Sequence, residues 1–207
     1  MVSEQAAAVR RLGVMGGTFD PIHIGHLVAA SEALHVFELD RVLFVPTGQP
    51  WQKSSYSDAE DRFLMTSLGA ATHRCFGVSR IELDRKGPTF TADTMRTLKE
   101  FHGPDTKLFF ILGADAAVRF GTWKNVAGLA DHTDFIAVTR PGFALGQIEP
   151  DDTWPEIHLM EMPGMDISAT DVRLRVRAGR PIDYLVPDQV VTYIKEQGLY
   201  VGPEFAA

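Results

Sequence analysis

The stretch GGTFDPIHIGH, residues 16–26, follows a short apolar run at residues 12–15 and leads into a longer amphipathic run that begins at residue 24. A short apolar run is expected of a strand covered on both faces, and the longer run is expected of a helix. The stretch is therefore predicted to be the turn from the first strand to the first helix. In a doubly wound sheet this turn lies at the edge where ligands bind.

The same alternation of short apolar and longer amphipathic runs continues along the chain. Strands are predicted at residues 12–15, 41–45, 76–83, 107–112, 134–139 and 157–160. Helices are predicted at residues 24–37, 59–71, 92–102, 115–129, 169–178 and 187–197. Repeated strand–helix units predict an α/β fold with a doubly wound, mainly parallel, Rossmann-like sheet.

Several residues predict where helices begin and end. Ser57 followed by Glu60 predicts a capping box at the start of the second helix, and Thr91 is predicted to be the N-cap of the third. Glycines are predicted to end three helices, at Gly103, Gly179 and Gly198.

Length and composition limit the classes of protein that fit. The 207 residues are expected to form one domain over 1–207, with its core at 12–160 and a small C-terminal helical part at 165–200. A formal net charge of −7 argues against nucleic acid and acidic membranes as partners. Cys75 is the single cysteine, the first eleven residues lack the apolar region typical of a secretory signal, and no apolar run approaches the about 18 residues that span a bilayer. A cytoplasmic protein is expected, and both a monomer and a homo-oligomer remain open.

The residues of the first turn suit an anion. Gly16 and Gly17 allow the backbone to approach a bulky ligand, and the helix that follows directs free N–H groups toward it. His23 and His26 lie three residues apart, on one face of the first helical turn. Their imidazole N–H groups are candidates for holding phosphate oxygens as charge develops in a transition state. A metal site is the weaker alternative, because no third ligand accompanies the pair.

Two common nucleotide-binding motifs are missing from the sequence. Gly13, Gly16 and Gly17 do not have the spacing of the dinucleotide fingerprint G-x-G-x-x-G, and no G-x-x-x-x-G-K-[ST] loop occurs. Hydride-transferring dehydrogenases and P-loop kinases therefore fit less well.

A second helix start that suits phosphate lies near the C-terminus, at ISATDVR, residues 167–173. Ser168 is predicted to be the N-cap, with Asp171 at the box position. The hydroxyls of Ser168 and Thr170, the exposed backbone N–H groups and Arg173 together form a candidate anion site.

These two motifs together resemble the nucleotidyltransferase superfamily, which shares its fold and the HIGH tetrapeptide with class I aminoacyl-tRNA synthetases. Two further segments narrow the resemblance, KGPTFTADTM at residues 86–95 and LGAD at residues 112–115, the latter followed by Trp123. With them, residues 12–200 resemble the bacterial nicotinate-nucleotide adenylyltransferases.

The resemblance implies a reaction. AMP would pass from ATP to the 5′-phosphate of nicotinate mononucleotide, giving deamido-NAD (nicotinate adenine dinucleotide) and pyrophosphate. The acceptor phosphate is already an anion, so in-line attack needs neither a general base nor a covalent intermediate. Mg²⁺ would accompany ATP, without a dedicated set of protein ligands.

The resemblance also assigns roles to individual residues. Those expected at ATP are Gly16, Gly17, Thr18, Phe19, His23, Gly25, His26, Gly113, Asp115, Ile167, Ser168, Thr170 and Arg173. Those expected at the acceptor are Thr18, Lys53, Thr89, Thr91 and Trp123. The residues expected to act on the reacting phosphates are His23, His26, Lys53 and Arg173.

The sequence departs from the family pattern at two places. Trp51 and Gln52 replace the proline and histidine that precede the loop lysine, and Ala169 replaces a serine. Two alternatives to the predicted function remain: adenylyl transfer to nicotinamide mononucleotide or phosphopantetheine, and a nucleotide-binding module without turnover.

Overall fold

The computed structural model describes residues 9–48, 57–117, 123, 127–129, 133–139 and 154–202. Within these residues, six strands form one sheet in the order β3-β2-β1-β4-β5-β6, and every pairing is parallel. The strands are β1 (Arg11–Gly17), β2 (Arg41–Pro46), β3 (Phe76–Val78), β4 (Lys107–Gly113), β5 (Thr133–Thr139) and β6 (Ile157–Glu161). The predicted α/β fold with a doubly wound parallel sheet is confirmed.

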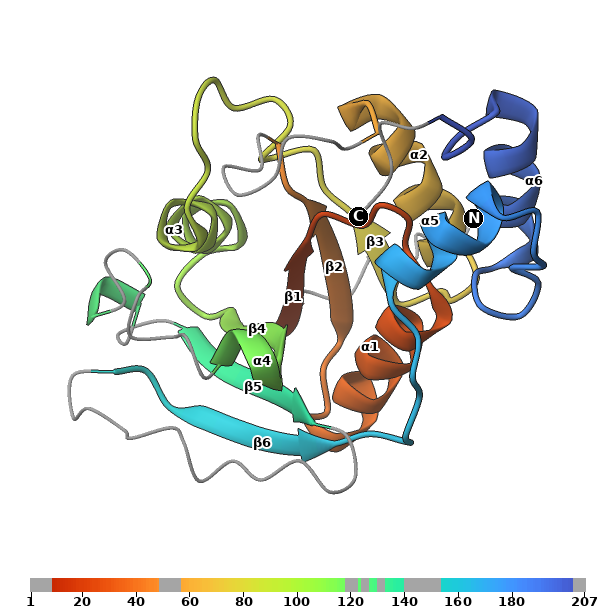
Figure 1. The fold of residues 1–207 in the computed structure, drawn as a ribbon. Coiled ribbons are helices and arrows are strands. Elements are labelled where there is room, and N and C mark those ends of the chain that lie inside the picture. The colour runs from red at the N-terminus through yellow and green to blue at the C-terminus, as the bar shows by residue number, and fades with distance from the viewer. Residues whose placement is uncertain are drawn as a thin grey trace, which may run out of the picture.

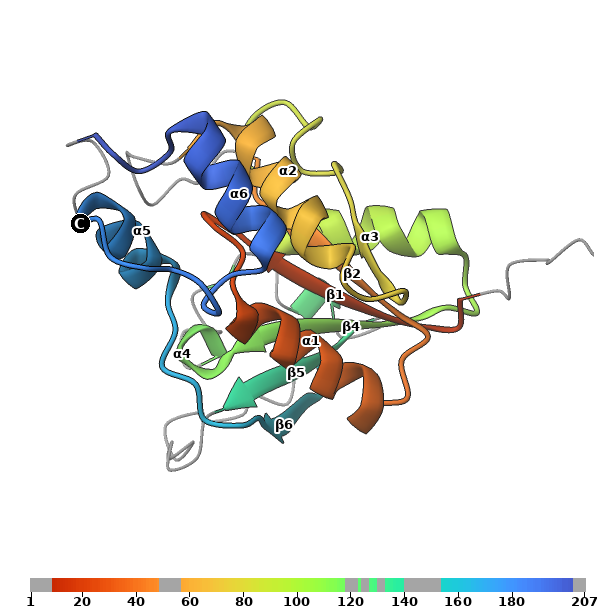
Figure 2. The same cartoon turned by 90° about the vertical axis from the view of Figure 1, so that its right-hand side faces the viewer.

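Helices cover both faces of this sheet (Figures 1 and 2). They are α1 (Ile24–Val36), α2 (Ala59–Ala70), α3 (Thr91–His102), α4 (Ala114–Ala117), the 3₁₀ helix η2 (Ala127–Leu129), α5 (Ala169–Arg177) and α6 (Asp188–Gln197). One core cluster contains buried residues of α1, α2, α5 and α6, and a second contains buried residues of α3, α4 and η2.

The central strand β4 shows why the sheet is covered on both faces. Its apolar side chains alternate between the two clusters, with Phe109 and Ile111 in the first and Leu108, Phe110 and Leu112 in the second. This alternation follows from the period of two residues in a strand. From β1 the chain adds β2 and β3 on one side, and it then returns to add β4, β5 and β6 on the other side. In such sheets, ligands bind in the crevice at the carboxyl ends of the two strands where the order switches, here β1 and β4.

Two predicted elements are shorter than expected. Strand β3 ends at Val78 instead of continuing to residue 83, and the N–H of Ser79 makes the last bond to the sheet, to the Phe44 carbonyl at 2.9 Å. A continuous helix over residues 115–129 was also wrong, because Trp123 lies in a bend and residues 127–129 form a 3₁₀ turn.

Two predicted helix caps were wrong by one residue. Asp58, instead of Ser57, caps α2, and its carboxylate accepts a hydrogen bond from the N–H of Glu60 at 3.0 Å. Phe90 is the N-cap of α3, so Thr91 is its first helical residue. The capping by Ser168 is confirmed, because its hydroxyl accepts from the N–H of Asp171 at 3.1 Å.

The three glycines predicted at helix ends all have positive φ angles. The values are 89° at Gly103, 65° at Gly179 and 60° at Gly198, a region that favours glycine. Among the residues that the structure describes, none of the helices is long and apolar enough to cross a membrane.

Candidate active site

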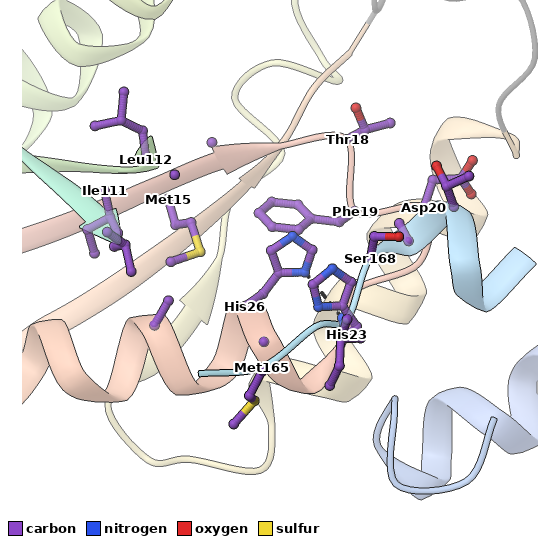
Figure 3. A pocket seen from close by; sticks show the side chains of 18 of the residues that line it. Met15, Thr18, Phe19, Asp20, His23, His26, Ile111, Leu112, Met165 and Ser168 are labelled. Atoms are coloured by element: carbon purple, nitrogen blue, oxygen red, sulfur yellow. Dashed lines mark hydrogen bonds between the residues drawn. The ribbon is translucent and has the colours of Figure 1, made fainter. Parts of the chain in front are cut away.

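A pocket of about 620 Å³ opens at the carboxyl ends of β1, β4 and β5 (Figure 3). The first turns of α1 and α5 complete its wall. Its volume lies within the usual range for small-molecule sites. The predicted site residues that line it are Gly16, Thr18, Phe19, His23, Gly25, His26, Gly113, Ile167, Ser168, Thr170 and Arg173. The two motifs, about 150 residues apart in the sequence, therefore face one cavity, as the doubly wound topology predicts.

The histidine pair occupies the start of α1. His23 is the N-cap, and the two rings stack with centroids 3.7 Å apart and an interplanar angle of 21°. The backbone N–H of His23 donates to Nδ1 of His26 at 3.2 Å. Nδ1 of His26 is therefore an acceptor, so the neutral ring carries its proton on Nε2.

The charge state of His26 follows from its surroundings. Burial lowers the pKa of His26 well below its usual value, and the neighbouring His23 lowers it further. His26 is therefore a neutral imidazole near pH 7. A neutral ring with Nε2–H can donate a hydrogen bond to an anion without first gaining a proton.

Gly16 and Gly17 are the last residues of β1, and the segment that follows them places Phe19 against the histidine pair. Phe19 has φ of 50°, an uncommon backbone conformation for a residue with a side chain. Its buried ring meets the His26 ring edge to face, with centroids 5.1 Å apart. Gly16 is needed for a different reason: a Cβ there would lie 2.9 Å from the Phe110 ring.

Asp20 links the turn to distant parts of the chain. Its carboxylate is buried and accepts hydrogen bonds from the Tyr200 hydroxyl at 2.8 Å and from the N–H of Ser57 at 3.3 Å. The Asp20 carbonyl accepts from the Arg173 guanidinium at 2.7 Å. The C-terminal part of the chain is thereby bonded directly to the first motif.

The start of α5 presents the second motif to the pocket. Ser168 caps the helix, and Thr170 accepts a hydrogen bond from Arg173 through its hydroxyl at 3.2 Å. With its bond to Asp20, Arg173 is held at two points beside the pocket. The cavity wall thus combines a cation, hydroxyls and a helix N-terminus, which together favour an anionic ligand.

Four predicted site residues do not line this pocket: Gly17, Thr89, Thr91 and Trp123. Trp123 packs on the opposite face of the sheet from α1, edge to face with Phe110 at 5.9 Å between centroids. Thr91 begins α3 on that same face. Trp123 therefore contacts the ring of Phe110, which also lies beside Gly16 of the pocket lining.

Two further predictions fall outside what the structure describes. Lys53, with Trp51 and Gln52, lies in residues 49–56, which are not described. Asp115 belongs to the short helix α4, but its side chain is not described.

Three residues that support the site were missed by the sequence analysis: Asp20, Arg62 and Tyr200. All three are at most 2% exposed. Asp20 lies inside the first motif and could have been found there, whereas Arg62 looks like any charge on an amphipathic helix. Tyr200 gives no local signal, because its partner Asp20 is 180 residues away.

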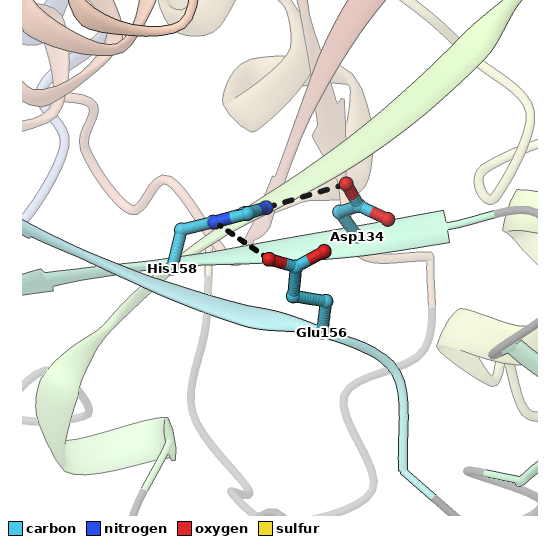
Figure 4. A group of neighbouring side chains, drawn as sticks. All are labelled: Asp134, Glu156 and His158. Atoms are coloured by element: carbon cyan, nitrogen blue, oxygen red, sulfur yellow. Dashed lines mark hydrogen bonds and ion pairs between the residues drawn. The ribbon is translucent and has the colours of Figure 1, made fainter.

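Outside the pocket, the described residues contain one group of three metal-ligating side chains, formed by Asp134, Glu156 and His158 (Figure 4). It lies near the amino ends of β5 and β6, at the opposite edge of the sheet from the pocket. His158 faces Asp134 at 3.3 Å and Glu156 at 3.5 Å, and the Lys107 ammonium is 2.6 Å from Asp134. Lys107 already supplies a cation to Asp134, so the group forms a polar network around this ion pair.

Comparison with known proteins places this chain in a family. The family model described as cytidylyltransferase-like matches residues 14–175. A protein of Corynebacterium kroppenstedtii is 53% identical over 92% of this chain and 91% of its own length. One of Paenarthrobacter aurescens is 54% identical over 93% and 92%. Both carry the name "Probable nicotinate-nucleotide adenylyltransferase".

The fold agrees with solved structures. The nicotinic acid mononucleotide adenylyltransferase of Plasmodium falciparum, complexed with APC, superposes with a TM-score of 0.72 at 20% identity, covering 92% of this chain and 97% of that one. The same enzyme complexed with NaAD also gives 0.72, at 21% identity. The chain therefore belongs to the cytidylyltransferase-like family and, within it, to the nicotinate-nucleotide adenylyltransferases.

Proposed function

We propose that this protein transfers AMP from ATP to the 5′-phosphate of nicotinate mononucleotide, releasing pyrophosphate and forming nicotinate adenine dinucleotide. The observation that carries this proposal is the stacked pair of His23 and His26 facing the start of α5 across one pocket. The names of relatives more than 50% identical support the choice of substrates. A place in NAD biosynthesis and in the cytoplasm follows from the same proposal.

His26 is assigned to the transition state. In-line attack on the α-phosphate moves negative charge onto the phosphate oxygens and the departing pyrophosphate. The Nε2–H of His26 would donate to an oxygen on which this charge develops, and the bond from the His23 N–H fixes the ring for that purpose. The acceptor phosphate needs no base, so alignment and charge stabilisation supply the catalysis.

The start of α5 is assigned to the triphosphate. Its Ser168 and Thr170 hydroxyls, its N-terminal N–H groups and the Arg173 guanidinium would bind phosphate oxygens. The two bonds of Arg173 to Asp20 and Thr170 support this role, because they orient the guanidinium before ATP arrives.

Mg²⁺ is expected to enter with ATP as part of the substrate. Among the lining residues that the structure describes, Asp20 has the only carboxylate, and its oxygens already accept bonds from Ser57 and Tyr200. The donors of the pocket thus suit phosphate oxygens better than a cation, which fits an ion that keeps phosphate and water ligands. Its chemical contribution is to neutralise phosphate charge.

The acceptor's ring is assigned to Thr91 and Trp123. The backbone N–H groups of the first turn of α3, beside Thr91, would bind the nicotinate carboxylate, and Trp123 would stack on the pyridine. Such donors favour a carboxylate over an amide, because an amide would place its own N–H groups against them. We therefore expect a higher kcat/KM with the nicotinate than with the nicotinamide mononucleotide, and an equal or higher value with the amide would refute this assignment.

Pyrophosphate release tests the function. The protein is mixed with ATP, Mg²⁺ and nicotinate mononucleotide, and parallel mixtures omit the acceptor or replace it with phosphopantetheine. Release that requires the nicotinate acceptor supports the proposal. Binding of ATP without release identifies a nucleotide-binding module, and release only with phosphopantetheine identifies the other transferase.

A further inference from the structure

Arg62 of α2 is a buried cation outside the pocket lining. The residue is 2% exposed, and its guanidinium donates to backbone carbonyls of four residues. The acceptors are Thr47 at 2.7 Å and Thr18, Gly48 and Ser57 at 3.2 Å each. Burying a guanidinium is costly unless its donors are satisfied, and these carbonyls accept hydrogen bonds from all three of its nitrogens.

The four carbonyls belong to three separate segments around the site. Thr18 follows β1, Thr47 and Gly48 follow β2, and Ser57 precedes α2. The N–H of Thr47 also donates to the Gly17 carbonyl at 2.8 Å. The planar, forked guanidinium suits acceptors in several directions, which a lysine ammonium on its flexible stem does not match.

The bond to Thr18 leads directly to His26. The next residue, Phe19, holds the uncommon φ of 50°, and such a conformation persists only where surrounding contacts impose it. The Phe19 ring then packs edge to face on His26, as Figure 3 shows. A shift of the Thr18 carbonyl would therefore move Phe19 and remove one of the contacts that orient the His26 ring.

We infer that Arg62 is a positioning residue for adenylyl transfer, which fixes the turn at residues 17–19 and, through Phe19, the orientation of His26. Its effect is on the geometry of the reacting phosphates, so its loss lowers kcat more than it raises KM. This inference rests on the proposed function. The unsubstituted protein tests that function independently of any Arg62 variant.

The test compares Arg62→Lys and Arg62→Ala with Arg74→Ala, an exposed arginine just after α2. Steady-state kinetics give kcat and the KM for ATP, and thermal unfolding in the assay buffer gives the folded fraction at the assay temperature. We expect Arg62→Ala to lose about 10²-fold in kcat, the scale of a catalytic group displaced by 1 Å. Arg62→Lys should lose nearly as much, and Arg74→Ala should match the unsubstituted protein.

Recovery of kcat on addition of guanidinium at tens of millimolar distinguishes a positioning role from a general loss of stability. The ion can enter the space left by Arg62→Ala and bond the same carbonyls, so kcat should recover several-fold. Urea, which has a similar shape and no charge, should not restore activity.

Three results would overturn the inference. One is a kcat of folded Arg62→Lys or Arg62→Ala that stays within about threefold of the unsubstituted value, because a displaced His26 predicts a loss of about 10²-fold. Another is a loss of activity that follows only the unfolded fraction, with guanidinium giving no recovery. The third is unfolding of both variants at the assay temperature, which assigns Arg62 to stability alone.

Discussion

Replacing His26 with asparagine separates its two hydrogen-bonding roles. The asparagine carbonyl can occupy the place of Nδ1 and keep the bond from the His23 N–H, which is 3.2 Å long in the structure. The donor at the position of Nε2 is lost. His26→Asn should therefore fold like the unsubstituted protein and lack the group assigned to the transition state. His26→Gln is its partner variant, because the longer amide can place an N–H near the position of Nε2.

The size of the effect follows from the role. Removing one preorganised donor from developing oxyanion charge costs roughly 10²–10³-fold in kcat, or about 2.7–4 kcal/mol. His26→Asn and His26→Ala should both show this loss, while His26→Gln retains part of the activity. The KM for ATP should change little, since the bond strengthens only as charge develops.

Pyrophosphate release under saturating substrates gives kcat, and a substrate titration gives kcat/KM. The reasoning fails if His26→Asn keeps a kcat within about threefold of the unsubstituted protein, against the 10²-fold expected of a lost donor. A loss confined to KM would also refute it and assign His26 to ground-state binding. Because a lowered pKa leaves His26 neutral, kcat/KM for ATP should not fall between pH 6.5 and 8.5 on account of this residue.

Three further predictions concern stability. The folded protein holds the pKa of His26 well below its value in the unfolded chain, so the unfolded chain takes up a proton first as pH falls. The free energy of unfolding of the unsubstituted protein, measured in urea titrations relative to that of His26→Asn, should therefore fall as pH drops from about 7 to 5. A difference between the two proteins that stays constant with pH contradicts this. Tyr200→Phe leaves a buried Asp20 oxygen without its 2.8 Å donor and should cost about 1.5–3 kcal/mol, whereas the exposed Tyr184→Phe should cost almost nothing. A Cβ at Gly48 would lie 2.2 Å from the Glu82 carbonyl, so Gly48→Ala should lower stability by about 1–3 kcal/mol and Gly77→Ala by clearly less; equal losses refute the packing argument.

The sequence predicted the elements that repeat a simple pattern. Apolar strands such as β4, which is covered on both faces, are visible as continuous runs, and their alternation with helices fixed the fold class. The two helix starts that are proposed to bind phosphate, at His23 and Ser168, could be predicted because short motifs contain all of their residues. The doubly wound topology then brought them to one pocket.

Two of the predictions that failed, the length of β3 and the cap of α2, depended on contacts between distant segments. Strand β3 ends at Val78 because the chain then turns and packs the Glu82 backbone against Gly48. Residues 79–83 include no glycine or proline that would have predicted this turn from the sequence. Ser57 does not cap α2 because it is buried, with its N–H bonded to Asp20. Helix and strand propensities depend only on neighbouring residues in the sequence. Tertiary contacts of this kind can therefore override the structure that the propensities predict.

The buried polar residues behind the site could not be predicted from the sequence for the same reason. Arg62 occupies an ordinary position on an amphipathic helix, and only the fold brings the carbonyls of Thr18 and Thr47 around it. Tyr200 reaches Asp20 from the other end of the chain. Buried polar groups of this kind can be recognised only in the folded structure, whereas the residues proposed to contact phosphate lie in recognisable motifs.

Product analysis tests the central claim most directly. The protein is incubated with ATP, Mg²⁺ and nicotinate mononucleotide, and the nicotinate adenine dinucleotide and pyrophosphate formed are both quantified by chromatography. Adenylyl transfer predicts equal amounts of the two products, with neither formed when the acceptor is omitted. Pyrophosphate without the dinucleotide, or no product from folded protein, would contradict the account.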